Sequence, residues 1–354
     1  MLRRFLKHVF GGRGASVEDD GLRLARNLYD ESRHEEAIKV LNALIEFKSG
    51  WMEALVLRGA TYRALGRMEE AFSDLSRALK LAPNDARCLY ENAMVWYKSG
   101  DNRRALEFCA SARLADPGFA TPRWLQAQIA FGGEAYMAVL ERIHAHLRPR
   151  TYLEIGVFQG ESLQLARSPT QAIGVDPEPK LLKPAAANHR VYAQTSDAFF
   201  AAHDLDVEFG GVPVDLAFID GMHHFEFALR DFANVERHCT RGSTVLIHDC
   251  YPLDRETARR DGAPPFWSGD IWRLIVLLRK HRPDLSVHTI GTAPTGLGLI
   301  RNLDPDSRFL TQNHDRLVEE FLGIDYSWLD ENKPGKLNLV ANDWVTVRQL
   351  LVQS

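Results

Sequence analysis

The stretch TYLEIGVFQGESL, residues 151–163, decides how the second half of this chain folds. It begins with a short apolar run that is typical of a buried strand, continues with two glycines four residues apart, and reaches Ser162, where we expect a helix to begin. A strand, a glycine turn and a helix form the first unit of an α/β sheet, and such a turn is a candidate cradle for a nucleotide. Ordinary tight turns also contain two glycines at this spacing, so the stretch alone identifies no ligand.

The residues after this stretch alternate between short apolar runs and helical patterns. We expect strands at 151–156, 172–176, 190–194, 214–220 and 243–249, with helices that begin near Gly160, Glu178, Asp197 and His224. This alternation predicts a parallel, doubly wound, Rossmann-like sheet with helices on both faces. Two further apolar runs, 285–290 and 296–302, are joined by a short loop and predict an antiparallel edge hairpin, which gives seven strands in all.

The first third of the chain repeats with a period of 34 residues. Two good copies cover 52–85 and 86–119, a degenerate copy covers 18–51, and a partial copy follows Thr121. Small residues such as Gly59 let paired helices approach closely, and Pro83 stops the second helix. The pattern resembles tetratricopeptide repeats, which implies an α-helical solenoid. Such arrays often bind partner proteins on a concave face, but a structural cap or a dimer surface is an equal alternative, so homo-oligomerisation stays open.

Length and charge limit the kinds of protein that this chain can be. The 354 residues exceed the usual size of one hydrophobic core, so we expect an α + α/β two-domain protein: a flexible basic leader at 1–17, a repeat domain at 18–132, and an α/β domain with a C-terminal helical extension at 133–354. The net charge of -4 gives no electrostatic footprint for nucleic acid. Charges interrupt the leader's apolar residues, so we expect no signal peptide and no transmembrane segment, although a basic arm that touches a membrane surface is an alternative. The four cysteines have no metal-binding spacing, and a cytoplasmic protein is expected.

Acidic residues end or follow nearly every expected strand. They are Glu154, Asp176, Asp197, Asp220 and Asp249. Ligands of α/β sheets bind beyond the carboxyl ends of the strands, although acids also gather there because these ends are wet and precede helix caps. The glycine loop has neither the dinucleotide pattern nor a P-loop lysine, and Glu154 beside it would repel a pyrophosphate. These features favour a ligand with a cationic centre and a ribose, whose hydroxyls Asp176 would bind.

From about residue 150 to 302 the chain resembles class I S-adenosylmethionine-dependent methyltransferases. The motifs LEIGVFQGES, GVDP and TSDAFF carry this resemblance, and DLAFIDGMHHFE, GSTVLIHDCYP and GDIW resemble the branch of small-molecule and sugar O-methyltransferases. The resemblance implies S-adenosylmethionine as cofactor and a hydroxyl of a sugar, glycan or other small molecule as methyl acceptor. The cofactor-binding residues that it implies are Glu154, Gly156, Gly160, Ser162, Asp176, Ser196, Asp197 and Asp220.

Methyl transfer to a hydroxyl requires a group that removes the hydroxyl proton. The resemblance implies this role for His223, with Asp220 and Asp249 completing the catalytic set; a helix-capping or substrate-orienting histidine is the alternative. Asp220 and Asp249 end neighbouring strands and are also the expected ligands of Mg²⁺. Alternatively, Asp220 contacts the cofactor and Asp249 orients His223. Cys250 is a poor ligand for a hard cation, and strand alternation is expected to turn His248 away from the site.

Residues 250–270 have no regular period, which is typical of a lid or binding loop. Its Arg255, Arg259, Arg260, Phe266 and Trp267 suit a sugar ring, a phosphate or a carboxylate, although a surface excursion without a role is the alternative. Two other functions stay open. The protein could be a repeat-based interaction scaffold whose methyltransferase-like domain binds cofactor without catalysis, or a methyltransferase for a protein or glycoprotein that the repeats recruit.

Overall fold

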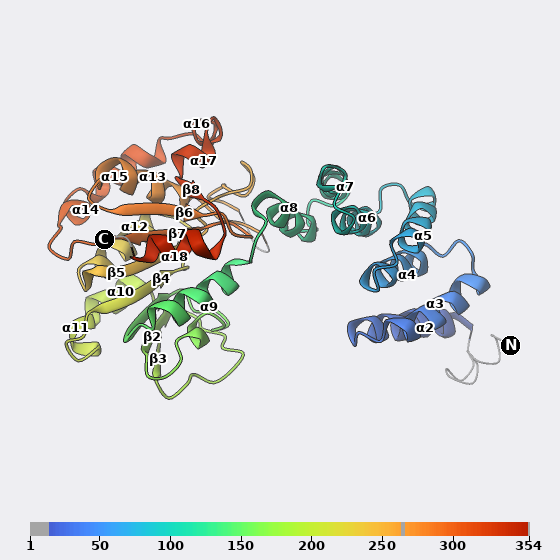
Figure 1. Cartoon of the computed structure of the whole chain (residues 1–354), viewed down its shortest axis with the longest axis horizontal. Coiled ribbons are helices and arrows are strands. Elements are labelled where there is room, and N and C mark those ends of the chain that lie inside the picture. The colour runs from blue at the N-terminus through green and yellow to red at the C-terminus, as the bar shows by residue number, and fades with distance from the viewer. Residues whose placement is uncertain (1–13, 263–265, 353–354) are drawn as a thin grey trace. The chain divides into compact units, whose positions relative to one another are not determined.

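The computed structural model describes residues 14–262 and 266–352, and the side chains from residue 19 onward. It divides into two compact units, Met1–Ile129 and Ala130–Ser354 (Figure 1). The division falls three residues before the boundary at 132/133 that the sequence suggests. Helix α2 begins at Gly14 and so reaches into the expected leader, and residues 1–13 of that leader lie outside the described residues.

Paired helices build the N-terminal unit, as the 34-residue repeat predicts. They are α2 (Gly14–Asp30) with α3 (His34–Phe47), α4 (Met52–Ala64) with α5 (Met68–Leu81), and α6 (Ala86–Lys98) with α7 (Asn102–Ala115), followed by α8 (Thr121–Phe131). A methyl group added at Gly59 would lie 2.7 Å from Leu75 Cγ, so the small residue is required by the close approach of α4 and α5. Gly66 (φ +75°) and Gly100 (φ +85°) adopt the left-handed conformation that turns the chain within each pair.

The C-terminal unit contains one eight-stranded sheet with the order β3-β2-β1-β4-β5-β7-β6-β8. Its strands are β1 (Thr151–Ile155), β2 (Gln171–Asp176), β3 (His189–Ala193), β4 (Val214–Ile219), β5 (Cys239–His248), β6 (Ser286–Ile290), β7 (Leu297–Arg301) and β8 (Leu339–Val340). All seven expected strands are present, and β7 runs antiparallel to both β5 and β6. The short β8 was not expected; it pairs in parallel with β6 and extends the sheet beyond the hairpin.

The helices of this unit depart from the expected pattern at two places. The unit contains α9 (Tyr136–Leu147), α10 (Ser196–Ala202), α11 (Leu205–Glu208), α12 (Phe225–Glu236), α13 (Trp272–His281), α14 (Phe309–Gln312), α15 (His314–Leu322), α16 (Tyr326–Asp330), α17 (Lys333–Lys336) and α18 (Trp344–Val352). The predicted helix after Gly160 is only a 3-10 turn, η1 (Leu163–Leu165), and the one near Glu178 is absent from residues 177–188. Both predictions were wrong because prolines follow: Pro169 after η1, and Pro177, Pro179 and Pro184 after β2.

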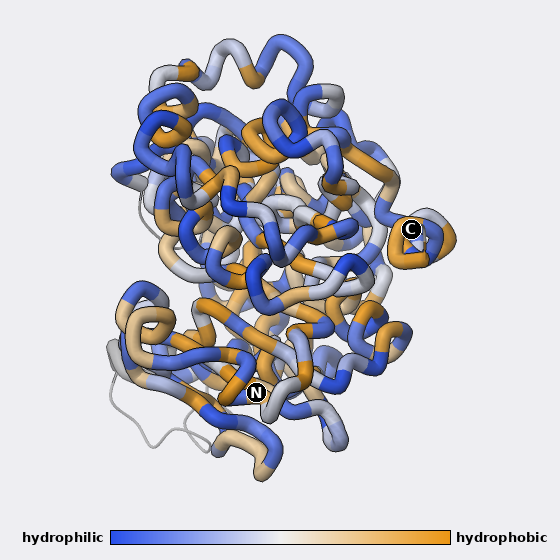
Figure 2. The backbone as a smooth tube through the Cα atoms, turned by 90° about the vertical axis from the view of Figure 1, so that its left-hand side faces the viewer, coloured by the Kyte–Doolittle hydropathy of each residue, from blue (hydrophilic) through white to orange (hydrophobic). Residues whose placement is uncertain are grey.

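Two apolar layers enclose the sheet because successive strand residues point to opposite faces. On one face Leu153, Ile173 and Val245 join a core with Phe225 and Leu229 of α12 and with residues of α13. On the other face Tyr152, Phe218 and Leu246 pack with residues of α9 and α18. The helix α9, which precedes β1, therefore covers the face that the missing helix after Gly160 would have covered. Figure 2 traces the alternation of hydropathy along the backbone.

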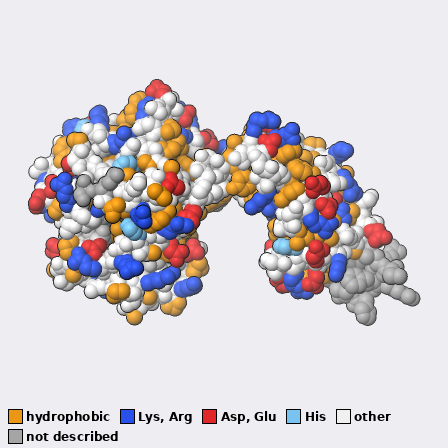
Figure 3. Space-filling model, in the orientation of Figure 1, with side chains coloured by type: hydrophobic (Ala, Val, Ile, Leu, Met, Phe, Trp, Pro, Cys, Tyr) orange, Lys and Arg blue, Asp and Glu red, His pale blue; other side chains and the backbone are white. Residues whose placement is uncertain are grey.

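None of the described helices combines the length and the hydropathy that crossing a lipid bilayer requires. Hydrophobic side chains do interrupt the charged surface of the C-terminal unit in Figure 3.

Candidate active site

Three predicted residues meet at the carboxyl edge of β4 and β5. Asp220 follows β4, His223 lies in the turn that leads to α12, and Asp249 follows β5. One side-chain oxygen or nitrogen of each lies within 4.8 Å of the others. The three residues line a cavity of about 10 Å³, which is enough space for a single water molecule or ion. The sheet therefore assembles the acid and histidine set that the sequence suggests.

A contact with the 250–270 loop orients the ring of His223. Its Nδ1 lies 3.0 Å from the carbonyl oxygen of Trp267, and because a carbonyl only accepts, Nδ1 donates the hydrogen. In the neutral ring Nε2 then carries the lone pair. Nε2 lies 3.0 Å from Asp249 Oδ2 and 4.0 Å from Asp220 Oδ1. This tautomer is the one that can accept a proton, or bind a cation, on the side of the two carboxylates.

The carboxylate of Asp249 is buried and only half satisfied. Oδ1 accepts a 2.6 Å hydrogen bond from Thr295 Oγ1, whereas Oδ2 is buried without a hydrogen bond although His223 Nε2 lies 3.0 Å away. A buried carboxylate oxygen without a donor is costly. The distance of 3.0 Å between His223 Nε2 and Asp249 Oδ2 matches the separation of neighbouring ligand atoms around an octahedral ion with bonds of about 2.1 Å. These observations fit a divalent cation, or a donor group of a ligand, between the two side chains.

His248 belongs to this cluster, contrary to the prediction that it points away. Its Nδ1 lies 3.1 Å from Asp220 Oδ1 and 3.4 Å from Asp249 Oδ2. The left-handed φ of Asp249 (+60°) breaks the strand alternation, so that two consecutive side chains reach the same edge. The His248 ring stacks on Tyr136, with centroids 4.1 Å apart. Burial opposes the charged form of His248, but the carboxylates of Asp220 and Asp249 outweigh it and raise the pKa of the ring.

Cys250 lies outside this cluster. Its buried Sγ contacts the carbonyl oxygen of Ile247 at 3.1 Å, within the apolar core. The thiol therefore packs in the core, outside the group of side chains that could hold a cation.

The glycine loop owes its shape to packing within the sheet. Gly156 has φ +87°, and a Cβ there would lie 2.0 Å from the carbonyl oxygen of Asp220, so only glycine lets the ends of β1 and β4 approach. Gly160 (φ +77°) would place a Cβ 2.7 Å from a methyl carbon of Leu181. Both predicted glycines thus hold the loop beside the strand-end acids.

Asp176 braces the same loop. Its Oδ2 accepts hydrogen bonds from the backbone N–H groups of Val157 (2.9 Å) and Phe158 (2.8 Å), and its Oδ1 accepts one from Glu178 N (2.7 Å). A carboxylate offers about four acceptor positions, so one remains for another donor. Binding of a ribose by Asp176 stays a prediction, and it would draw on this remaining position.

Glu154 is fully buried beneath the loop. It accepts hydrogen bonds from Tyr152 Oη (2.6 Å) and Ser162 Oγ (2.8 Å). Burial raises the pKa of Glu154 to about 8, more than these hydrogen bonds lower it. At neutral pH the side chain is therefore mainly protonated, and it organises the loop from below. Contact of Glu154 with the amine of a cofactor stays a prediction.

Ser196 and Asp197 connect α10 to α12. Asp197 forms two hydrogen bonds with Arg230, of 3.1 and 2.8 Å, at a half-exposed position. Ser196 hydrogen bonds to Asp231, whose pKa burial raises to about 7. The structure places both residues at the sheet edge after β3, and their contact with the adenine side of a cofactor is untested.

The arginines of the 250–270 loop are engaged within the protein. Arg255 pairs with Asp325 (2.9 Å), Arg259 with Asp261 (2.7 Å), and Arg260 with Glu226 (2.6 Å) and Asp270 (2.7 Å). They fasten the loop instead of presenting free cations, which differs from the predicted pairing with a substrate anion. The Trp267 side chain lies against the catalytic candidates, with its ring centroid 5.0 Å from that of His223.

Comparison with known families agrees with the two-part architecture. Residues 153–250 match the model of a methyltransferase domain, and residues 62–129 match that of a tetratricopeptide repeat. The chain carries both kinds of domain. The methyltransferase match runs from β1 to the residue after Asp249 and so contains Asp220, His223 and His248. Among curated proteins, none matches this sequence.

Several solved structures resemble about a third of the chain. The type III secretion translocator chaperone SycD of Yersinia enterocolitica is 18% identical over 33% of this chain and 88% of its own, with a TM-score of 0.30. PcrH from Pseudomonas aeruginosa is 22% identical over 33% of this chain and 89% of its own, with a TM-score of 0.30. MamA is 20% identical over 32% of this chain and 61% of its own, with a TM-score of 0.29. Scores this low support no conclusion about function.

Proposed function

We propose that the protein is an S-adenosylmethionine-dependent methyltransferase that methylates a hydroxyl of a sugar or other small molecule. The observation that carries the proposal is the position of His223 Nε2, which faces two strand-end carboxylates inside a methyltransferase domain. The tetratricopeptide repeats would recruit a protein partner or the substrate.

The edge of the sheet fits the cofactor. S-adenosylmethionine, when bound, supplies a methyl group on a cationic sulfur. Three apolar side chains at this edge, Phe158, Leu182 and Met222, are 58–64% exposed in loops that follow β1, β2 and β4. Exposed apolar area beside carboxylates suits an adenosine with a cationic tail. The remaining acceptor position of Asp176 and the loop of Gly156 and Gly160 would hold the ribose side.

In this proposal His223 acts as general base. Nε2 takes the proton of the acceptor hydroxyl, so that the oxygen lone pair can form the new bond to carbon. The Trp267 carbonyl holds Nδ1–H and fixes the ring, and the carboxylate of Asp249 stabilises the imidazolium that results. Asp249 is buried, which strengthens this charge interaction.

Asp220 and Asp249 would hold a divalent cation such as Mg²⁺. Asp249 Oδ2, which is buried and forms no hydrogen bond, and the cavity of about 10 Å³ support this assignment. A cation there would supply positive charge for oxygen atoms of the acceptor.

A non-catalytic scaffold is the second candidate function. It draws support from Asp176, whose carboxylate is largely used by its own loop, and from the complete burial of Glu154. Cofactor binding and catalysis are therefore tested separately.

Isothermal titration with S-adenosylmethionine tests the cofactor. We expect the full chain to bind it, and Asp176→Ala to weaken binding at least about tenfold, since a hydrogen bond to a charged group is lost. Asp315→Ala, at an exposed position on α15, serves as the matched control. Thermal unfolding checks that the Asp176 variant retains its fold. Absence of S-adenosylmethionine binding to the wild-type chain would disprove the proposal.

Catalysis is tested by mass spectrometry on an extract of glycans and small molecules. We expect methylated products that disappear with His223→Ala, with turnover reduced about 10²- to 10⁴-fold while S-adenosylmethionine still binds. EDTA should lower turnover, and Mg²⁺ or Mn²⁺ should restore it. A His223→Ala variant with full turnover would disprove the role as base, and a chain that binds cofactor but methylates nothing favours the scaffold.

A further inference from the structure

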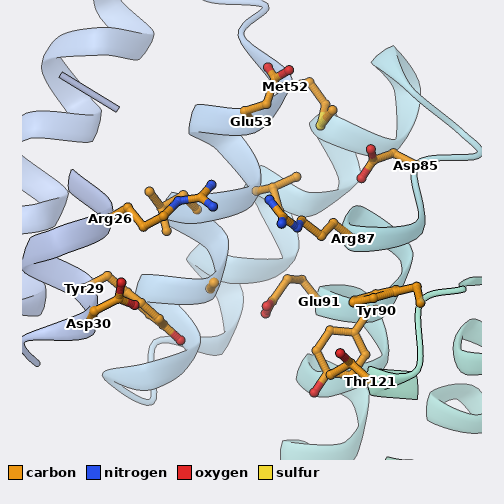
Figure 4. Close-up of a pocket in the computed structure, with 14 residues that line it drawn as sticks. Arg26, Tyr29, Asp30, Met52, Glu53, Asp85, Arg87, Tyr90, Glu91 and Thr121 are labelled. Atoms are coloured by element: carbon orange, nitrogen blue, oxygen red, sulfur yellow. The ribbon is translucent and has the colours of Figure 1, made fainter. Parts of the chain in front are cut away.

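A cavity of about 380 Å³ lies within the tetratricopeptide unit and is lined by none of the candidate active-site residues. Helices α2, α4 and α6 and the segment that enters α8 line it (Figure 4). Val56, Leu57 and Ala60 of α4 are buried and form an apolar floor, and Tyr90 and Phe119 add aromatic walls. The size and the apolar lining suit a side chain of a ligand.

Two arginines of this cavity have no partner. Among the described residues, the side chains of Arg26 on α2 and Arg87 on α6 form neither a hydrogen bond nor an ion pair. In Figure 4 their guanidinium groups point toward one another from facing helices. Both arginines are exposed and line the same cavity without a counterion, which favours an anion there, and the guanidinium fork matches a carboxylate.

The acids of the cavity do not fill this role. Glu91 pairs with Arg63 at 3.0 Å, and Asp85 accepts the N–H of Cys88 as the N-cap of α6. Glu53, which has no ion pair, points away from both guanidinium groups in Figure 4. Asp30 lies near Tyr29 in Figure 4, one turn of α2 after Arg26, and among the described residues it too forms no ion pair.

The cavity continues past Arg87. A second cavity, of about 520 Å³, shares Asp85, Arg87 and Phe119 with the first and extends along Asn84 and Asp116. A ligand that lies between the arginines can therefore continue past Arg87 into the second cavity. This geometry suits an acidic side chain inside an extended segment better than the carboxylate at a chain end.

We propose that the repeats bind an extended peptide segment of a partner protein, with an acidic side chain between Arg26 and Arg87 and a neighbouring apolar side chain on the floor formed by Val56, Leu57 and Ala60. The inference rests on the part of the proposed function that assigns partner recruitment to the repeats. It is independent of methyl transfer, so failure of either one leaves the other standing.

Fluorescence anisotropy with the full chain tests the inference. The probe is a fluorescein-labelled peptide with blocked ends in which glutamate alternates with leucine. We expect it to bind at least about tenfold more tightly than the same peptide with glutamine for glutamate, and to weaken as salt rises. Two further probes, a glutamine peptide with a free C-terminal carboxylate and one with phosphoserine, test the other anions.

Matched variants locate the binding site. Arg26→Gln with Arg87→Gln should abolish the preference for glutamate, whereas Lys39→Gln with Lys80→Gln removes the same charge from exposed positions outside the cavity and should have no effect. Glu53→Gln should tighten binding about two- to threefold because it removes a repulsive carboxylate. This gain of binding cannot result from misfolding.

Several results would overturn the proposal. They are failure of the glutamate probe to bind, equal binding of the glutamate and glutamine probes, an unchanged preference in the arginine double variant, and tighter binding of the free C-terminus or of phosphoserine than of glutamate.

Discussion

Burial changes the protonation state of Glu154, which lies beneath the glycine loop. Its carboxyl group lies wholly inside the protein between Tyr152 and Ser162, and burial raises its pKa from 4.5 to about 8. Between these two values the folded protein holds a proton that the unfolded chain has released. Stability therefore falls as pH rises from about 4.5 through about 8 and is then constant with respect to this group.

Glu154→Gln should remove this dependence. At pH 8 the variant should unfold with a free energy about 1–3 kcal/mol higher than wild type, and at pH 5 the two should be nearly equal. Calorimetric unfolding of the C-terminal unit between pH 5 and 9 measures the difference, with the exposed Glu178→Gln as control. Parallel profiles for wild type and variant would show that Glu154 does not titrate as its burial implies.

The end of the 250–270 loop is fixed beside His223 by the close packing of Gly269 and by the hydrogen bonds of Asp270. Gly269 has φ +60°, and a Cβ there would lie 1.8 Å from the carbonyl oxygen of His223. Asp270 is fully buried, donates its N–H to the same carbonyl, and accepts the N–H of Phe225 at the start of α12. The loop and the turn that carries His223 are therefore one packed assembly.

Gly269→Ala should displace this assembly. We expect turnover to fall at least about tenfold while S-adenosylmethionine binding changes less than twofold, because a shift of the base misplaces it relative to the acceptor hydroxyl. Stability should fall by about 1–3 kcal/mol. Gly242→Ala is the matched control, since the nearest atom to its added Cβ lies 3.8 Å away. Unchanged turnover and unfolding temperature in the Gly269 variant would contradict the coupling.

Sequence patterns predicted the elements that repeat or alternate, and missed those that depend on local exceptions. The seven strands were confirmed because each is a short apolar run between turns, and β1 and β7 are buried along their whole length. The helices after β1 and β2 were wrong because prolines outweighed the general β–α alternation. β8 has only two residues and no period to detect. His248 was misplaced because the left-handed turn at Asp249 lies outside any alternation rule.

At the scale of the whole molecule, the chain contains two separately built units. Each of the four hydrophobic clusters of the described residues lies inside one unit: two in Met1–Ile129 and two in Ala130–Ser354. The residues proposed to bind cofactor and acceptor all belong to the second unit, and both arginines of the proposed peptide site belong to the first. Cofactor binding and partner binding should therefore be separable by cutting the chain once.

A fragment of residues 130–354 should unfold cooperatively and bind S-adenosylmethionine within about twofold of the full chain, because its sheet is covered on both faces by its own helices. Calorimetry and isothermal titration measure the two quantities. The same fragment should not bind the glutamate peptide in the anisotropy assay.

The fragment also tests what the repeats do. If it methylates a small acceptor at the full-chain rate, the repeats serve recruitment. If it folds and binds cofactor but loses activity on a protein or glycoprotein acceptor, the repeats recognise the substrate. A folded fragment that has lost the cofactor would contradict the division, since the first unit would then have to complete the cofactor site.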